Sequence, residues 1–86
     1  MNRQKQIAST IAWRLSDLRE ASGAKQKSIA ELIGTSQSRM SEYEHGEILP
    51  SLFSLIKLAD IYGVSIDYIV GRTDIQKMCK EEAMHG

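Results

Sequence analysis

Chemically reactive side chains are scarce in this sequence. Its 86 residues include one cysteine, Cys79, and two histidines, His45 and His85, so neither a disulfide framework nor a zinc cluster can be built within one chain. The sequence also lacks a phosphate-cradling glycine loop and a nucleophile with a credible base. We therefore expect no enzyme, no catalytic residue, no metal site and no cofactor.

Long apolar runs are also missing. No stretch approaches the roughly 20 residues of a membrane helix. The N-terminus, MNRQKQIAST, has a basic start without the continuous apolar region of a secretory signal. These absences predict a cytoplasmic protein that makes no membrane contact.

Net charge is absent as well, because 11 basic residues balance 11 acidic ones. This balance argues against binding nucleic acid through bulk charge alone. The distribution is uneven: residues 1–45 carry seven Lys or Arg and five Asp or Glu, whereas residues 46–86 carry four and six. The weak asymmetry favours an anionic partner at the N-terminal half.

The apolar periodicity predicts an all-α domain. Residues 7–22 carry a stripe with helical spacing that ends before Gly23. The stripe consists of Ile7, Ile11, Leu15 and Leu18. Residues 1–6 precede it and are expected to form a flexible arm. Trp13 lies off the stripe and is expected to cover the edge of the core, with partner binding as the alternative.

Two shorter helical patterns meet at a glycine. The first covers residues 26–33 and is ended by Gly34, because only glycine enters the left-handed conformation without steric cost. The second covers residues 37–44, is capped by Ser36 and is closed by Gly46. The apolar residues that fill the wedge between them are Ile29, Ile33, Met40 and Tyr43. This spacing predicts a helix-turn-helix.

Two further helices complete the expected domain. One is capped by Ser51 and covers residues 52–62, and the other is capped by Ser65 and ends at about Val70. Their apolar residues are expected to supply the core that keeps the helix-turn-helix rigid. These residues are Leu52, Leu55, Leu58, Ala59, Val64, Ile66 and Ile69.

The last segment, residues 72–86, is a candidate for a short sixth helix that ends at about Met84. Thr73 and Gln76 fit a capping box. The residues that would stripe one side are Ile75, Met78, Cys79 and Ala83. Such a helix would either support a dimer, which we favour, or fray in solution. Cys79 is interpreted as a small hydrophobe, with a redox switch as the alternative.

Several motifs agree in order and spacing over residues 11–73. They are LSDLREASG, the helix-turn-helix, the turn EHG and the run PSLFSLIKLADIYGVSIDYIVGRT. In these features the chain resembles the Cro and phage-repressor family, also called XRE-like. The resemblance implies a five-helix, lambda-repressor-like DNA-binding domain over residues 7–71.

The same resemblance implies a function. It indicates a sequence-specific regulator of transcription, most simply a repressor that binds a palindromic operator in double-stranded DNA as a homodimer, with residues 37–44 in the major groove. The alternative is a protein-binding module with a protein partner, as when an antitoxin of this fold masks a toxin.

Within that resemblance, five side chains are expected to read base edges. They are Ser36, Gln37, Ser38, Ser41 and Glu42. Gln37 is the first choice, because its amide can donate to N7 of adenine and accept from the N6 amine. Ser38 can bond either kind of edge, and Glu42 can accept from the amine of cytosine. The alternative for each is an ordinary solvated helix surface.

Phosphate contacts are expected at the start of the helix that covers residues 26–33. In the resembling family a glutamine at its first position bonds a phosphate together with the helix's N-terminal amides, and Gln26 has that position. The further candidates are Lys25, Lys27, Arg39 and His45. Arg39 is also placed to pair with Glu42 and offset its repulsion of DNA. Because the family usually has a polar cap such as serine where Lys25 stands, this helix is expected to start weakly.

Two remaining assignments concern packing and partners. Arg19 and Glu44 match an internal ion pair of the family, which we prefer to a DNA contact by Arg19. The candidates for a dimer or partner surface are Phe53, Ile61, Tyr68 and Met78. The alternative for these apolar residues is a wider core.

Overall fold

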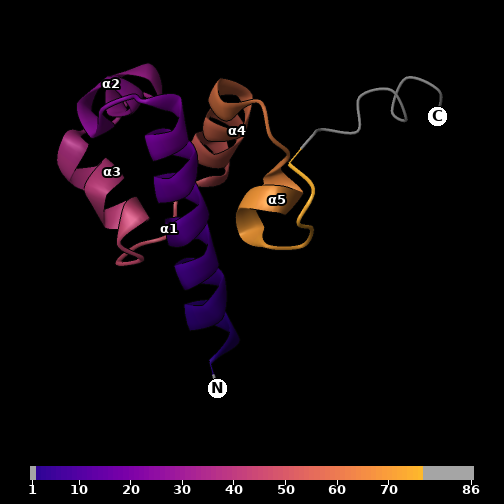
Figure 1. Ribbon diagram of the computed structural model, residues 1–86. Coiled ribbons are helices and arrows are strands. Elements are labelled where there is room, and N and C mark those ends of the chain that lie inside the picture. Colours follow the sequence, from indigo (N-terminus) through magenta and orange to yellow (C-terminus); the bar gives the residue numbers. More distant parts are fainter. Residues whose placement is uncertain (1, 77–86) are drawn as a thin grey trace.

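The structure is a computed structural model and describes residues 2–76 (Figure 1). Five α-helices make up the regular structure of this range, which contains no strand. They are α1 (Arg3–Ser22), α2 (Gln26–Leu32), α3 (Gln37–Glu44), α4 (Leu52–Tyr62) and α5 (Ile66–Val70). The all-α prediction with five helices is confirmed. Among the described residues, no helix is long and apolar enough to cross a membrane.

The long helix α1 is the element around which the others pack. It contacts α3, α4 and α5, and in Figure 1 the pair α2 and α3 lies on one side of it, with α4 and α5 on the other. Four helices each contribute a fully buried side chain to the centre. These side chains are Leu15, Met40, Leu58 and Ile69. The core therefore fixes the helix-turn-helix, α2 and α3, against α1 and the C-terminal helices.

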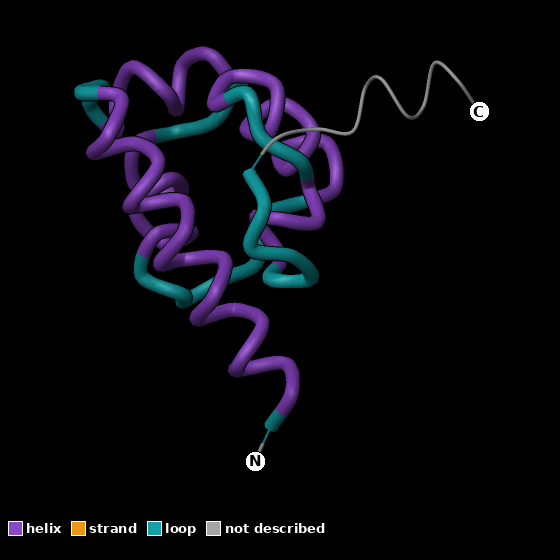
Figure 2. Tube along the Cα trace, turned by 45° about the vertical axis from the view of Figure 1, so that its right-hand side comes forward, coloured by secondary structure: helices purple, strands orange, loops and turns teal. Residues whose placement is uncertain are grey.

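The first helix starts earlier than expected. Asn2 caps it, because its Oδ1 accepts hydrogen bonds from the backbone N–H groups of Gln4 at 2.8 Å and Lys5 at 3.4 Å. Residues 3–6, assigned to a flexible arm, are instead the first turn of α1, which projects beyond the other helices (Figure 2). The apolar stripe begins only at Ile7, so it marked the start of burial and missed the polar turn before it.

The helix limits depend on short-range contacts. Three serines, Ser36, Ser51 and Ser65, each accept a hydrogen bond from the backbone N–H three residues later, at 3.0 to 3.1 Å. Between α2 and α3, Gly34 has φ +76°, the left-handed conformation that the turn requires. At the start of α2, Lys25 makes no side-chain capping bond. The polar cap from whose absence a weak start of α2 was expected is therefore missing in the structure.

Three burial assignments are corrected by the structure. Leu52, expected in the core, is 67% exposed, because the buried side of α4 is formed by residues 54, 58 and 59. Tyr68, expected on an exposed patch, is 6% exposed and packs in the core. Trp13 is 63% exposed on the outer side of α1 and does not cover the core edge.

The segment after α5 passes Arg14 of α1 and turns back to the start of α5, without forming a helix as far as it is described. Arg14 holds it there, since its Nη1 donates to the carbonyl oxygens of Tyr68 and Thr73 at 2.5 and 2.6 Å, and its Nη2 donates to Asp74 Oδ1 at 2.8 Å. At its end, the carbonyl oxygen of Gln76 accepts from the backbone N–H of Ser65 at 3.0 Å.

These contacts overturn the first part of the predicted sixth helix. The carbonyl of Thr73 and the carbonyl of Gln76 are both used in tertiary hydrogen bonds, and residues 73–76 are not helical. The capping box expected from Thr73 and Gln76 is therefore wrong. The rest of that candidate helix, including Met78 and Cys79, lies outside the described residues.

Candidate nucleic-acid interface

The outer side of α3 and the start of α2 form one polar surface. Met40 and Tyr43 turn inward and are buried, which leaves the opposite side of α3 accessible. A shallow hollow of about 370 Å³ lies on this surface. Its lining residues are Gln26, Gln37, Ser38, Ser41, Glu42 and Glu47. The structure thus brings four of the five expected base-reading residues together with the expected phosphate ligand Gln26.

Ser36 lies at the edge of this surface with a structural role of its own. Its Oγ accepts from the backbone N–H of Arg39 at 3.1 Å and so caps α3. Because a hydroxyl both accepts and donates, its hydrogen is still available to a partner.

Glu42, one of the two acids that line the hollow, is partly neutralised. Arg39 Nε lies 3.5 Å from Glu42 Oε1, the i, i+3 pairing expected from the sequence. Both side chains are about half exposed, so the pair adds little to stability. Its electrostatic effect is to lower the negative potential that Glu42 presents on α3. Glu47 carries a second negative charge into the same hollow and makes no ion pair among the described residues.

Beneath this surface, the carboxylate of Glu44 is the centre of a buried cluster. The expected ion pair is present: Arg19 Nε donates to Glu44 Oε2 at 2.7 Å and Arg19 Nη2 donates to Glu44 Oε1 at 3.0 Å. The Glu44 side chain is only 2% exposed. The hydrogen bond to Glu44 raises the pKa of Arg19 above its usual value, so Arg19 keeps its positive charge.

Two more side chains donate to Glu44 Oε1, and sequence reasoning missed both. Ser16 Oγ lies at 3.3 Å and Gln26 Nε2 at 3.0 Å. A polar residue three positions before Arg19 on the same helix could have pointed to Ser16. Nothing local pointed to Gln26, which is 18 residues from Glu44.

A tyrosine hydroxyl lies close to the same cluster. Burial raises the pKa of Tyr62 to about 12, and the negative charge of Glu44 acts in the same direction. The hydroxyl is buried and has no hydrogen-bond partner among the described residues. It therefore stays protonated and neutral beside the ion pair.

The other candidate phosphate ligands are close in sequence to residues that line the hollow, and all of them are solvent-exposed. Lys25 and Lys27 lie at the start of α2, and neither makes an ion pair within residues 2–76. His45 ends α3, where its Nδ1 lies 2.7 Å from the carbonyl oxygen of Ser41 and 3.2 Å from its Oγ. These contacts hold the imidazole against the last turn of α3.

Comparison with protein families decides what kind of domain this is. The model of the helix-turn-helix family matches residues 15–69, which include α2, α3 and the hollow. The chain belongs to the helix-turn-helix family. The resemblance drawn from the sequence motifs is thereby confirmed.

Curated relatives of this helix-turn-helix domain are regulators of transcription. The chain is 34% identical over 68 residues to the HTH-type transcriptional regulator ImmR of Bacillus subtilis, and the match covers 79% of this chain and 54% of the relative. It is 41% identical over 62 residues to the cryptic phage CTXphi transcriptional repressor RstR of Vibrio cholerae, covering 72% and 55%. The chain thus spans about half the length of these relatives. Both are named as regulators and neither as an enzyme, in agreement with the expectation that the chain is not an enzyme.

The helix-turn-helix domain also exposes an apolar face on α4. Phe53 is 77% exposed, and Leu52 and Ile56 beside it on the helix are 67% and 41% exposed. Leu49, three residues before α4, is 53% exposed. We call Leu49, Leu52, Phe53 and Ile56 the α4 apolar face. Of the residues expected on such a surface besides Phe53, Ile61 is 37% exposed, Tyr68 is buried, and Met78 lies outside the described residues.

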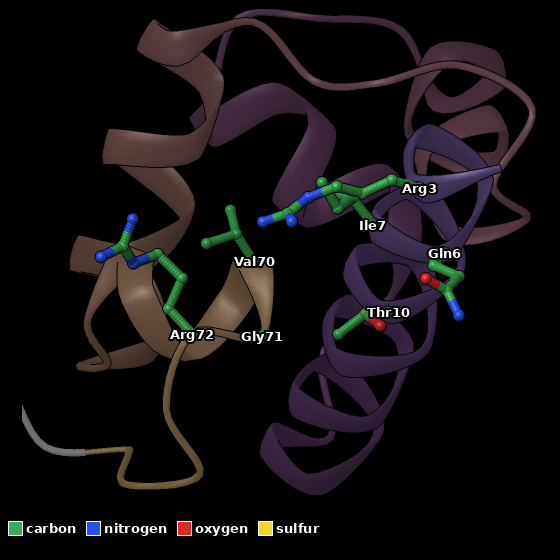
Figure 3. Close-up of a pocket in the computed structure, with 7 residues that line it drawn as sticks. All are labelled: Arg3, Gln6, Ile7, Thr10, Val70, Gly71 and Arg72. Carbon is green, nitrogen blue, oxygen red and sulfur yellow. The ribbon is translucent and has the colours of Figure 1, made fainter. Parts of the chain in front are cut away.

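A second hollow, of about 580 Å³, lies between the first turns of α1 and the end of α5 (Figure 3). Its lining residues are Arg3, Gln6, Ile7, Thr10, Val70, Gly71 and Arg72. None of them belongs to α2 or α3, and none is among the expected DNA contacts. Two of its lining residues, Gly71 and Thr10, approach closely: a Cβ on the glycine would lie 2.8 Å from Thr10 Cγ2.

Proposed function

We propose that this helix-turn-helix domain binds double-stranded DNA sequence-specifically and regulates transcription in the cytoplasm, most simply as a repressor that occupies an operator. The observation that carries the proposal is the hollow on α3. It combines side chains that can read base edges with the start of α2, which can hold a phosphate. Its outer walls are polar and accessible, as a helix that enters the major groove requires.

Base reading is assigned to the outer side of α3. Gln37 is exposed in the first turn, where its amide can meet both N7 and the N6 amine of one adenine. Ser38 and Ser41 supply hydroxyl groups beside it, and Glu42 supplies an acceptor whose charge is offset by Arg39. Ser36 donates from the cap position.

Phosphate binding is assigned to the start of α2. No side chain caps this helix, so the first backbone N–H groups have no side-chain acceptor and remain available to a phosphate oxygen. Gln26 lines the hollow at the same helix start. Lys25 and Lys27 add positive charge there, and Arg39 and His45 extend it along α3.

We further propose that the domain binds DNA as a homodimer on a palindromic site. A single α3 of eight residues reads few bases, and two copies related by a two-fold axis would place their recognition helices about 34 Å apart. The α4 apolar face is the surface that a second copy would cover, because it gathers four exposed apolar residues in one stretch of chain. A different protein on this face, as in an antitoxin that masks a toxin, is the second candidate, and it is favoured by the zero net charge of the chain.

The test is selection from fragmented genomic DNA of the source organism at one stated salt concentration. The wild type should enrich a short palindrome, and the double variant Gln37→Ala, Ser38→Ala should lose or change that enrichment. The matched control is Gln4→Ala with Ser9→Ala, which removes the same two exposed residue types from α1 and should enrich the wild-type palindrome. Folded wild-type protein that enriches nothing would contradict the proposal, and any stably copurifying protein would then support the second candidate.

A further inference from the structure

Glu44 joins three helices below the α3 surface. It is the last residue of α3, its ion-pair partner Arg19 lies on α1, and the third contact comes from Gln26, the first residue of α2. Arg19 also donates from Nη1 to the carbonyl oxygen of Ala24 at 3.0 Å, just before α2. The carboxylate is therefore held from one side by α1 and meets α2 on the other.

We propose that Glu44 is a positioning residue for DNA binding, which orients the side-chain amide of Gln26 towards a phosphate. This inference rests on the proposed function. Gln26 Nε2 donates to Glu44 Oε1 at 3.0 Å. A primary amide has two N–H hydrogens and one carbonyl oxygen, so one hydrogen is used by Glu44 and the other remains available as a donor.

The negative charge of Glu44 selects this orientation of the amide. If the Gln26 amide turned over, its carbonyl oxygen would face the carboxylate, which has no hydrogen to give when ionised. A buried carboxylate that loses a donor is destabilised, and Glu44 is 2% exposed. The N–H end of the amide therefore stays on the Glu44 side of the hollow. Because the amide group is planar, the bond to Glu44 also fixes the direction of its second N–H.

The orientation matters because a phosphate oxygen only accepts hydrogen bonds. An amide free to turn would present its oxygen to the phosphate part of the time, whereas an amide fixed by Glu44 presents a donor. Gln26 lines the same hollow as Gln37. Because Glu44 belongs to α3, the phosphate contact on α2 is fixed relative to the helix that reads the bases.

The first measurement uses the wild-type protein and needs no variant. The side-chain amide hydrogens of Gln26 are followed by NMR in ¹⁵N-labelled protein, free and with the palindromic duplex recovered in the selection. We expect one hydrogen to show a hydrogen bond to Glu44 in both states, and the other to shift only when the duplex is added. Loss of the bond to Glu44 in the complex would overturn the inference.

The second measurement is a double-mutant cycle on duplex affinity, made at one salt concentration and at a temperature where circular dichroism shows each variant folded. Gln26→Ala should weaken binding about tenfold, which corresponds to about 1.4 kcal/mol. Glu44→Gln should weaken duplex binding roughly three- to tenfold. The amide of the new glutamine can pair with either end of the Gln26 amide, so the orientation of Gln26 is no longer fixed. The double variant should bind no worse than Gln26→Ala. If the affinity losses of the two single variants multiplied in the double variant, the two residues would act separately and the inference would be overturned.

A matched control separates positioning from stability. Ser16→Ala removes another hydrogen bond to Glu44 Oε1 without touching Gln26, so it should lower thermal stability slightly and leave duplex affinity unchanged. An equal loss of affinity in Ser16→Ala would mean that any disturbance of the cluster weakens binding, against the inference. If the wild type binds no duplex at all, the proposed function itself fails; if it binds and only the coupling is absent, the inference alone fails.

Discussion

The guanidinium of Arg14 lies over the aromatic ring of Tyr68, with 4.1 Å between Cζ and the ring centroid. The same guanidinium donates hydrogen bonds to the carbonyl oxygens of Tyr68 and Thr73. One side chain of α1 therefore holds both α5 and the segment after it. This contact closes the domain on the side opposite the helix-turn-helix.

We expect Arg14→Met to destabilise the domain by about 2–3 kcal/mol, because it removes a cation–π contact and three hydrogen bonds from a charged donor, of which the one to the exposed Asp74 adds little. Urea unfolding followed by circular dichroism measures the change. The control is Arg72→Met, since Arg72 is 78% exposed and its ion pair with Asp67 spans 3.7 Å, so its loss should cost less than about 0.5 kcal/mol. Equal effects of the two substitutions would contradict the role given to Arg14.

Gly71→Ala should cost more than Gly23→Ala. Both glycines have positive φ, +88° and +76°, which costs an alanine about 1 kcal/mol. Only Gly71 has a close neighbour, because an added Cβ would lie 2.8 Å from Thr10 Cγ2, whereas nothing lies within 4 Å at Gly23. We expect losses of about 1 kcal/mol for Gly23→Ala and about 2–3 kcal/mol for Gly71→Ala in thermal unfolding.

The excess at Gly71 can be assigned by a second substitution. Thr10→Ser removes the methyl group that the new Cβ would meet and should recover the excess in the Gly71→Ala background, leaving only the backbone cost. If Thr10→Ser recovers nothing, the close approach of α1 and α5 is not the cause.

Stability at high pH should depend on Tyr62. The folded-state pKa, about 12, lies above the ordinary value of 10.0, so between these values the unfolded chain loses a proton that the folded protein keeps. The contribution of Tyr62 to stability is therefore complete below about pH 10 and is lost as the pH rises towards 12. Tyr62→Phe removes this dependence.

The measurement for Tyr62 is the difference in free energy of unfolding between the wild type and Tyr62→Phe. It should be constant from pH 7 to 9 and should shift against the wild type from pH 10 upward. Near pH 7 the phenylalanine should be neutral or slightly stabilising, because the buried hydroxyl has no partner among the described residues. A difference that stays constant to pH 11.5 would contradict the raised pKa.

Lys25→Ser should have opposite effects on stability and on DNA binding. Serine can cap α2, where Lys25 makes no capping bond, and should stabilise the domain by about 0.5–1 kcal/mol. The loss of a phosphate contact should weaken DNA binding and reduce the slope of log affinity against log salt by about 1. Lys57→Ser on α4 is the control and should leave the slope unchanged. An unchanged slope in Lys25→Ser would remove Lys25 from the phosphate ligands.

Phe53→Ser should weaken self-association at least tenfold in sedimentation equilibrium, because Phe53 is the most exposed member of the α4 apolar face. Trp13→Ser is the matched control: Trp13 is also a large aromatic residue and 63% exposed, but it lies on α1. A wild type that stays monomeric with and without DNA, or an equal loss in Trp13→Ser, would contradict the dimer surface.

Most helix limits could be predicted because they depend on residues close in sequence. A serine cap and the backbone N–H that donates to it are three residues apart, and the turn between α2 and α3 needs only the positive φ of Gly34. The resemblance to the repressor family, and not the spacing, implied that the outer side of α3 reads bases. Which side is the outer one followed in the same way as the helix limits, since the inward positions Met40 and Tyr43 determine which side of α3 is left outside. Local spacing was sufficient for these features.

Other features were decided only by tertiary structure, because their partners are distant in the chain. Arg14, 54 residues away, lies over the ring of Tyr68, which packs in the core. The carbonyl oxygen of Thr73 is bonded to the same arginine, and its Oγ1 accepts from the backbone N–H of Ile75 in a segment that is not helical. The orientation of Gln26 depends on Glu44 in the same way. The sequence by itself determined most of the helix limits, because caps and turns are local. Which polar groups of the helices meet, and which apolar residues of α4 stay exposed, was decided by how the helices pack.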